Sequence, residues 1–427
     1  MNRGDYGFQG DFMSNGIITP GREWTAKLTE VKYVYRYVDF DKLDGHTLTL
    51  RNKYCFTDIA NLFYLKYTVL ANGSAIETGN LVLPPCAPGQ SAFINIPYKD
   101  VADDGKEYVV TLSLCLKNAT TWAERGYEML AQQFAINAAG GVAKSVADPT
   151  FVQQPRAALP AVTAKGKLKV KGNTVTGENF SLAFDADGSI ANWTYNGTQI
   201  VEPSTGPDFC GFRSIANDNV SLGATGGVAK NDNLVGGVIT GKKTLVKAPR
   251  KVGKNVVVET AVANSVDTHA IRYTIYPDGT VDMRIAFNNS NADNRRVGVT
   301  MQFAPGMEKV DYYAKGPWSN YIDRQRGSLL GLYHTTVDGM FEELSAPQTM
   351  GDRQGLRYLQ LTGNGIKLGV QTEGQLAFSL SHIDDAQLDY DVFYGGKHPY
   401  DLVRKPQIFA HFDFWQRGIG NRSCGGD

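Results

Sequence analysis

Short runs in which apolar and polar residues alternate, separated by turn-forming residues, recur along almost the whole chain. Strict alternation places the apolar side chains on one face of a strand, and helical periodicity is weak everywhere. The sequence therefore predicts an all-β protein. The clearest runs of the N-terminal part are residues 31–38, 47–50, 64–70, 92–96 and 108–114.

The N-terminal part, residues 27–137, has the strand density of an immunoglobulin-like β-sandwich. About seven strands in about 110 residues are typical of that fold. Asn72-Gly73 and Asp104-Gly105 are the strongest hairpin signals, because both dipeptides readily adopt the positive φ angles of tight turns. Residues 121–133 are the best candidate for a short turn or helix.

Residues 138–160 are rich in Ala, Gly, Gln and Pro, which predicts a linker or an extended crossing segment. Alternation resumes in residues 161–427, a region too long for a simple sandwich. We therefore expect a large antiparallel supersandwich of two packed sheets. Its clearest strands are residues 172–177, 181–184, 256–260, 271–275 and 281–285.

Charge and composition exclude several classes of partner. The chain has 43 Lys and Arg and 43 Asp and Glu residues, whereas nucleic acids and anionic membranes select basic surfaces. No apolar run approaches the roughly 20 residues of a membrane helix, and the first residues contain no signal-peptide region. A soluble protein is predicted, with cytoplasm and periplasm both open. The histidines form no cluster, and the dispersed cysteines predict no disulfide framework: Cys55, Cys86, Cys115, Cys210 and Cys424.

The densest local pattern is an aromatic and polar loop that follows Gly316-Pro317. Gly-Pro ends the preceding β-rich run. One interpretation is a buried hydrogen-bonded network that closes one end of a sheet, which we favour because buried polar groups are normally paired. The other is a sugar-binding surface. The residues concerned are Trp318, Asn320, Tyr321, Asp323 and Arg324.

Several ordered motifs, this loop included, are similar to those of one enzyme family. The chain resembles the C-terminal part of the large β-galactosidases of glycoside hydrolase family 2, in which the loop reads Gly-Pro-x-x-Asn-Tyr-x-Asp-Arg. The segments that carry the resemblance are residues 19–32, 52–64, 209–219, 316–324, 347–358 and 413–425.

The resemblance implies an immunoglobulin-like domain followed by a galactose-mutarotase-like supersandwich, with residues 1–26 leaving a catalytic barrel. The family's reaction is the retaining hydrolysis of terminal β-galactosides by two glutamates of that barrel. One of these glutamates belongs to an Asn-Glu dipeptide, which this sequence lacks. The resemblance thus implies a portion that completes the active site and is not catalytic alone. Its partners would be the barrel, a β-galactoside in the intact enzyme, or further copies of the chain.

The resemblance also implies residues at the rim of the active site. Phe12 and Asn15 match a loop whose carbonyl and amide oxygens help to hold Na⁺, so they are candidates for a partial sodium site. Asn15, Ser423, Cys424, Trp318 and Asn320 are candidates for substrate contacts; Cys424 replaces an aromatic residue that stacks on sugar in the family. The chain itself requires no cofactor, while Mg²⁺ belongs to the parent enzyme's barrel.

Two alternatives remain open. The chain could be a stand-alone carbohydrate-binding or assembly module, or a mutarotase-like enzyme that uses His382 or His411 with a carboxylate. The sequence places no glutamate opposite either histidine. Asp384-Asp385 and Glu342-Glu343 are best interpreted as solvated loop charges, and Trp415 as a residue of the sheet core or of an interface.

Overall fold

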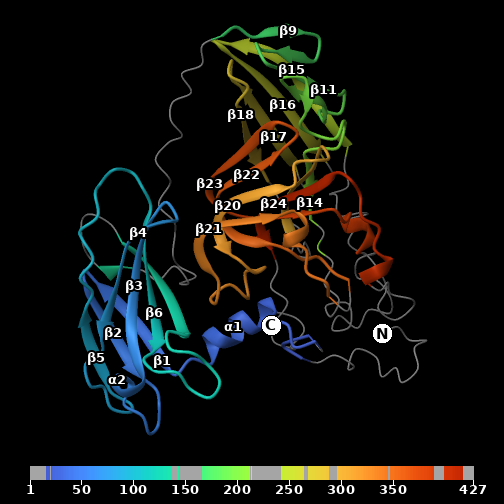
Figure 1. Cartoon of the computed structure of the whole chain (residues 1–427). Helices are drawn as coiled ribbons and strands as arrows, with labels where there is room; N and C mark the ends of the chain where they lie inside the picture. Colours follow the sequence, from blue (N-terminus) through green and yellow to red (C-terminus); the bar gives the residue numbers. More distant parts are fainter. Residues whose placement is uncertain are drawn as a thin grey trace, which may run out of the picture.

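Antiparallel β-sheets make up nearly all the regular structure of the chain (Figure 1). The computed structural model describes residues 16–19, 21–136, 142–143, 166–211, 213, 242–263, 268–287, 296–344, 347–388 and 399–416. The predicted all-β fold class is confirmed. Figure 1 shows two lobes, formed by the N-terminal and C-terminal sheets.

The N-terminal lobe is a sandwich of two four-stranded sheets, with strand orders β5-β2-β1-β8 and β4-β3-β6-β7. Inward-facing side chains such as Leu43, Leu48, Phe63 and Phe134 are buried between the sheets. The strands are β1 (Val38–Asp44), β2 (Thr47–Asn52), β3 (Phe63–Ala71), β4 (Ser74–Val82), β5 (Ser91–Asn95), β6 (Tyr108–Leu116), β7 (Glu128–Ile136) and β8 (Val142–Ala143).

The strand predicted for residues 31–38 was wrong. Helix α1 (Ala26–Val34) occupies most of that segment, and β1 begins only at Val38. The Thr25 hydroxyl caps the helix by accepting from the Leu28 amide at 3.2 Å, and the following residues include strong helix formers. Capping and propensity therefore prevail over alternation here. A short helix of one turn, α2 (Ile59–Leu62), lies before β3, and three 3-10 turns are described in the C-terminal lobe, at Asp338–Met340, Asp385–Gln387 and Pro399–Asp401.

The turn predictions had mixed outcomes. Asn72-Gly73 joins β3 to β4 with both φ angles positive, so this hairpin is confirmed. Asp104-Gly105 is not a hairpin, because β5 pairs with β2 whereas β6 pairs with β3 and β7. Of the short turn or helix considered for residues 121–133, the helix was wrong: residues 121–126 form bends and a turn, and β7 begins at Glu128 and buries Gln132.

The C-terminal lobe contains three sheets that share one core. Their orders are β13-β12-β11-β10-β9, β15-β16-β17-β18 and β14-β19-β24-β23-β22-β20-β21. The first two sheets comprise β9 (Lys169–Lys171), β10 (Thr174–Thr176), β11 (Phe180–Phe184), β12 (Ile190–Tyr195), β13 (Thr198–Gln199), β15 (Lys242–Val252), β16 (Asn255–Ala263), β17 (Thr268–Ile275) and β18 (Val281–Ala286). The third comprises β14 (Asp208–Cys210), β19 (Arg296–Phe303), β20 (Lys309–Gly316), β21 (Leu329–Thr336), β22 (Arg353–Gly363), β23 (Ile366–Ser381) and β24 (Ile408–Gln416).

One continuous apolar cluster connects these sheets. It includes Leu182 of β11, Tyr273 of β17 and Phe378 of β23, all almost fully buried. The five strands expected here coincide with β10, β11, β16, β17 and β18. The sequence analysis expected two packed sheets; the described residues instead form three antiparallel sheets on one shared core. Of the predicted linker, only Val142–Ala143 is described, and these residues pair with β1 as strand β8. The rest of the linker and the predicted lobe limits at residues 137 and 161 lie outside the described residues.

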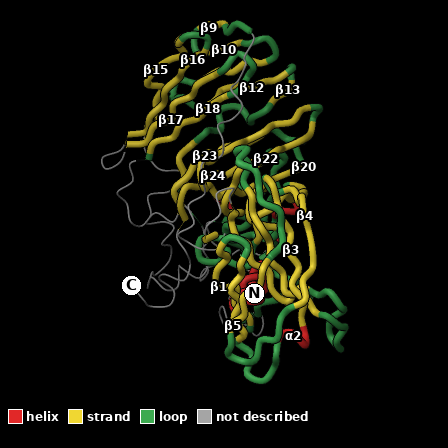
Figure 2. Tube along the Cα trace, turned by 90° about the vertical axis from the view of Figure 1, so that its left-hand side faces the viewer, coloured by secondary structure: helices red, strands yellow, loops and turns green. Residues whose placement is uncertain are grey.

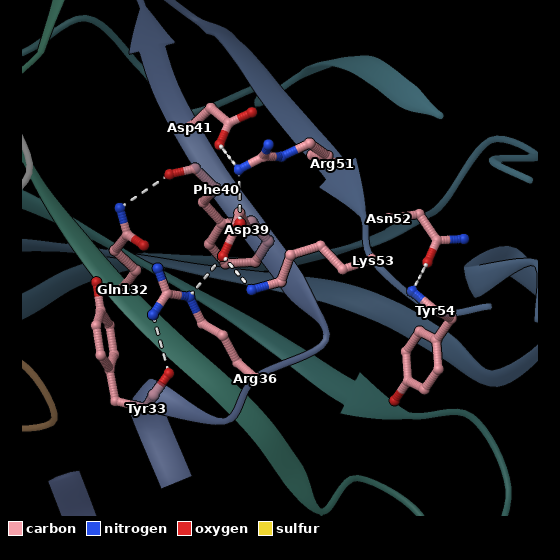
Figure 3. A network of polar contacts seen from close by, with 10 residues as sticks. All are labelled: Tyr33, Arg36, Asp39, Phe40, Asp41, Arg51, Asn52, Lys53, Tyr54 and Gln132. Atoms are coloured by element: carbon pink, nitrogen blue, oxygen red, sulfur yellow. Dashed lines mark hydrogen bonds and ion pairs between the residues drawn. The ribbon is translucent and has the colours of Figure 1, made fainter. Parts of the chain in front are cut away.

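A charged cluster fixes α1 on the first sandwich (Figure 3). The Asp39 carboxylate in β1 lies 3.0 Å from Arg36 Nε, 3.1 Å from Lys53 Nζ and 2.8 Å from Arg51 Nη2. Arg36 also donates to the carbonyl oxygen of Tyr33 in α1 at 2.9 Å. The carboxylate thus joins the end of the helix to both strands of the β1–β2 hairpin.

The two lobes meet at a specific contact that we call the seam, formed by Glu107, Gln133, Tyr313, Leu330 and Arg357. Arg357 Nε and Nη2 donate to the two carboxylate oxygens of Glu107 at 3.0 and 2.6 Å, and Tyr313 donates to Glu107 at 2.7 Å. Gln133 and Leu330 exchange two further bonds of 2.8 and 2.7 Å. Side chains, and not only the connecting chain, therefore set how the lobes dock.

Close backbone packing accompanies these bonds at the seam. A Cβ atom at Gly73 would lie 2.8 Å from the Tyr313 ring and 2.9 Å from Leu332, so the β3–β4 hairpin approaches the second lobe as closely as a glycine allows. From α1, the Glu30 carboxylate accepts from the amide of Gly327 at 2.8 Å. The helix that replaced the predicted strand is thus itself part of the contact between the lobes.

Candidate functional site

The loop after β20 is held by one fully buried asparagine. Asn320 donates to the carbonyl oxygens of Lys315 and Trp318 at 3.1 and 3.0 Å and accepts from the amide of Gln354 at 2.8 Å. The backbone amide of Asn320 donates to the carbonyl oxygen of Asp352 at 2.8 Å. Both ends of its side chain are therefore used within the protein, as the interpretation as a buried network expects.

Tyr321 anchors the other side of the same loop. Its hydroxyl donates to the carbonyl of Thr349 at 3.2 Å, and its ring lies 3.9 Å from the guanidinium carbon of Arg213. Burial raises the pKa of the Tyr321 hydroxyl, so it stays protonated and acts as a donor. Arg324 donates to the Ser319 hydroxyl at 3.1 Å, which closes the loop on itself.

A buried ionic cluster lies at the start of β19. Arg296 Nε lies 3.0 Å from Asp413, and Arg296 Nη1 donates to Asp385 and to His411 Nδ1, both at 3.0 Å. Burial opposes the charge of Arg296, but the carboxylates of Asp413 and Asp385 hold its pKa well above the ordinary value. The guanidinium is therefore a permanent positive charge in the interior.

Gln416 connects the ionic cluster to the loop. Its side-chain amide donates to Asp413 at 2.7 Å and also to the carboxylate of Asp352, and Gln354 donates to Gln416 at 3.1 Å. Burial raises the pKa of both carboxyl groups, while Arg296 acts in the opposite direction. We call Arg296, Asn320, Asp352, Asp413 and Gln416 the sheet-end network.

Internal contacts hold the side chains of the sheet-end network. His411 is buried, and desolvation lowers its pKa to about 4, so it is neutral near pH 7 and accepts from Arg296. One carboxylate oxygen of Asp352 and one of Asp413 accept from Gln416. Opposed carboxylates across an open cleft, which a glycosidase requires, are not found among these residues.

His382 does face a glutamate, which the sequence did not reveal. Its Nε2 lies 2.9 Å from Glu308, and its Nδ1 lies 3.1 Å from the carbonyl oxygen of Gln407. Protein oxygens thus lie within hydrogen-bond distance of both ring nitrogens, and the histidine side chain is 10% exposed. A mutarotase-like role gains no support from this pair.

The remaining sequence candidates differ in exposure. Trp318 exposes 36% of its surface, so it lies at the edge of the network, whereas Asn320 exposes none. Asp323 is also exposed. Trp415 exposes 43%, so the predicted core position was wrong and an interface role stays a prediction.

Four of the candidate site residues cannot be placed. Phe12, Asn15, Ser423 and Cys424 lie outside the described residues, so the sodium site and this part of the rim stay predictions. In the part of the chain that the structure describes, no three His, Cys, Asp or Glu residues form a group that could hold a metal ion.

The sequence analysis missed the ionic half of the sheet-end network. It assigned no role to Arg296, Asp352, Asp413 or Gln416. Its interpretation of Asp385 as a solvated loop charge was wrong, because this side chain is largely buried and pairs with Arg296. The available signal was a charged residue within a strongly apolar strand, such as Asp413 in β24, whose residues are all buried from Ile408 to Asp413. Such a position requires a buried partner, but the partner's identity is not visible from one strand.

Comparison with known protein families shows to which family the chain belongs. A family described as "Beta galactosidase small chain" matches residues 176–427, and one described as "Beta-galactosidase, domain 4" matches residues 48–137. The chain belongs to the β-galactosidase small chain family. The first match contains the whole sheet-end network, so the network is part of the family's own domain.

Similar proteins are β-galactosidases from several bacteria. One from Priestia megaterium is 26% identical over 98% of this chain and 39% of its own length. Those of Halalkalibacterium halodurans and Lactobacillus delbrueckii subsp. bulgaricus are 23% and 25% identical, over 96% and 90% of this chain. The chain thus spans about 39% of the length of the first two relatives. Among the described residues, no helix has the length and apolar character to cross a membrane.

Proposed function

We propose that the chain is the C-terminal, non-barrel portion of a β-galactosidase-type glycoside hydrolase that cleaves terminal β-galactosides with retention. The observation that carries the proposal is the family match over residues 176–427, together with coverage of only about 39% of the relatives. The retaining reaction needs two opposed carboxyl groups about 5 Å apart. The buried carboxylates described above are instead paired internally, which supports a role without chemistry.

In this proposal the lobes support a catalytic barrel and add residues to its rim. Trp318 is the described rim candidate, because it is partly exposed while its carbonyl is fixed by Asn320. Asn15, Ser423 and Cys424 complete the proposed rim. Phe12 and Asn15 would supply two oxygen ligands to Na⁺, a donor type that suits a hard cation, and the barrel would supply the others.

Complementation tests the proposal directly. The purified chain is assayed with a chromogenic β-galactoside, alone and mixed with the P. megaterium enzyme truncated to remove the region that matches this chain. We expect hydrolysis only in the mixture, with the truncated enzyme alone as the control. Normal turnover by the chain alone would overturn the assignment, and an inactive mixture would count against a complementing portion.

A carbohydrate-binding module is a second candidate with a specific observation behind it. Trp122 exposes 62% of its surface and packs edge-to-face with Tyr127 at 5.4 Å between ring centroids. Lys32 Nζ lies 5.2 Å from the same tyrosine ring. Exposed aromatic rings stack on sugars. Loss of galactose-oligosaccharide binding in Trp122→Ala, measured without any barrel, would favour this function.

A further inference from the structure

The outer face of the β15–β18 sheet carries a row of ionic side chains. Figures 1 and 2 place this sheet at the end of the second lobe away from the first. Lys247 pairs in register with Glu259, Glu259 with Arg272, and Arg272 with Arg284. Side chains directly opposite each other in neighbouring antiparallel strands share a face of the sheet, so these four lie side by side.

A row of small side chains runs beside the ionic row. Ala261 pairs with Ala270, and Ala270 pairs with Ala286, each two residues from its charged neighbour on the same strand. Long side chains beside short ones leave a shallow groove across the sheet. The groove has a volume of about 290 Å³ and is lined by Glu259, Arg272 and Arg284 of the ionic row, by the three alanines and by Val246.

The groove is positively charged. Glu259 is its central carboxylate and lies 2.6 Å from Lys247, 3.8 Å from Arg250 and 4.0 Å from Arg272. The hydrogen bond from Lys247 is the main cause that lowers the pKa of Glu259, so this carboxylate is ionised. One carboxylate therefore faces three cations.

The far end of the row adds a further cation. Arg284 lies 3.3 Å from Asp282 in the same strand, and its side chain is 76% exposed. Arg272, Arg284 and Glu259 line the groove itself, which gives one positive charge in excess, and Lys247, Arg250 and Asp282 lie beside it. The guanidinium groups are accessible to a ligand, since the Arg272 side chain is also 52% exposed.

The arrangement of the two arginines is unfavourable without a ligand. Arg272 and Arg284 are directly opposed on neighbouring strands, and like charges in that position destabilise a sheet. The stability of these strands comes from the other face, where Ile271 and Tyr273 are buried. An anion between the two guanidinium groups would remove the repulsion and accept charge-assisted hydrogen bonds.

We propose that this groove binds a small anionic ligand through its carboxylate, sulfate or phosphate group, with Arg272 and Arg284 as the main contacts. The volume suits a ligand of monosaccharide size, since typical pockets for larger ligands start at about 300 Å³. The lining includes no aromatic ring on which a neutral sugar could stack. This inference goes beyond the proposed function, and it does not depend on it.

Calorimetric titration of the full chain tests the site with galacturonate, inorganic phosphate and neutral galactose. We expect galacturonate or phosphate to bind, galactose not to bind, and the affinity to fall with added salt. Binding by galacturonate alone identifies a sugar carboxylate as the ligand group, and binding by phosphate identifies a phosphate group. Failure of both anions at about 10 mM, weaker than almost any specific site, would overturn the proposal.

Variants separate the groove from general charge effects. Arg272→Ala with Arg284→Ala should weaken anion binding at least about tenfold, the loss expected for removed charge-assisted bonds. Lys254→Ala, an exposed cation in the β15–β16 turn, is the matched control and should change the affinity less than about twofold. Arg272→Lys should restore part of the affinity, because it keeps the charge but not the fork of donors. Equal binding by the double variant, with unchanged thermal unfolding, would refute the assignment.

Discussion

Removal of the Glu107 carboxylate should destabilise the docking of the two lobes. In the seam, this carboxylate accepts two bonds from Arg357 and one from Tyr313. The Arg357 side chain is 4% exposed and the Glu107 side chain 18% exposed. Glu107→Ala would therefore leave a buried guanidinium without its carboxylate partner, although the carbonyl of Gly355 still accepts from it at 2.6 Å.

The magnitude follows from the burial of the pair. Removing one partner of a buried ion pair costs about 3–5 kcal/mol, because the remaining charge stays desolvated. Glu107 retains some contact with water, so the lower end, about 3 kcal/mol, is the appropriate value. For a lobe of this size that loss corresponds to a fall of roughly 6–12 °C in the unfolding temperature.

Differential scanning calorimetry measures this fall. Asp44→Ala is the matched control, because Asp44 forms a 3.6 Å ion pair with Lys42 in which both side chains are about half exposed. Exposed pairs contribute about 0–1 kcal/mol, so the control should unfold almost as the wild type does. A Glu107→Ala variant that unfolds within the range of this control would refute the reasoning about the seam.

Three further variants test other parts of the structure. Asn320→Ala should destabilise the second lobe by about 2–4 kcal/mol in urea unfolding, because several buried backbone groups lose their partner. His46→Gln should lower the unfolding temperature more at pH 5.5 than at pH 8.5. The hydrogen bond to Asp100 raises the pKa of His46 above 6.5. The stabilisation by protonated His46 is therefore present below pH 6.5 and is lost as the pH rises through the raised pKa. Lys315→Met should raise the unfolding temperature at pH 7. Burial, with a smaller effect from the charge of Arg357, lowers the pKa of Lys315 to about 8. Below this pH the buried amine is charged, and its desolvation destabilises the folded state.

The alternation of apolar and polar residues was enough to predict the fold class and most strands, because the apolar positions of each strand show in its own sequence which face is buried. It failed at residues 31–38, where Tyr33 is buried as in a strand but the Thr25 cap starts a helix. It also failed at Asp104-Gly105. A positive-φ turn is a local property, whereas the pairing of β5 with β2 is set by the packing of distant strands.

Of the candidate site, the sequence predicted the loop around Asn320 but not the ionic cluster around Arg296. The density of polar and aromatic residues around Asn320 indicated a closed loop, and the loop's contacts are mostly within about ten residues or with the neighbouring strand β22. Arg296 is different, because its partners Asp385 and Asp413 lie about 90 to 120 residues away. No periodicity within one strand identifies such partners. Asp413 becomes a neighbour only when β19 pairs with β24, and Asp385 approaches from the turn that follows β23.

The seam and the sheet-end network use the same device, a buried arginine neutralised by a carboxylate from a distant part of the chain; Arg357 and Glu107 are 250 residues apart. Such pairs add little net stability compared with apolar replacements, but they disfavour every arrangement that leaves a charge unpaired. If the lobes serve to position a barrel, specificity of docking matters more than stability. Glu107→Leu combined with Arg357→Met should then regain most of the unfolding temperature lost in Glu107→Ala, yet complement the truncated relative less well than the wild type. Full recovery of both properties would show that the seam contributes stability alone.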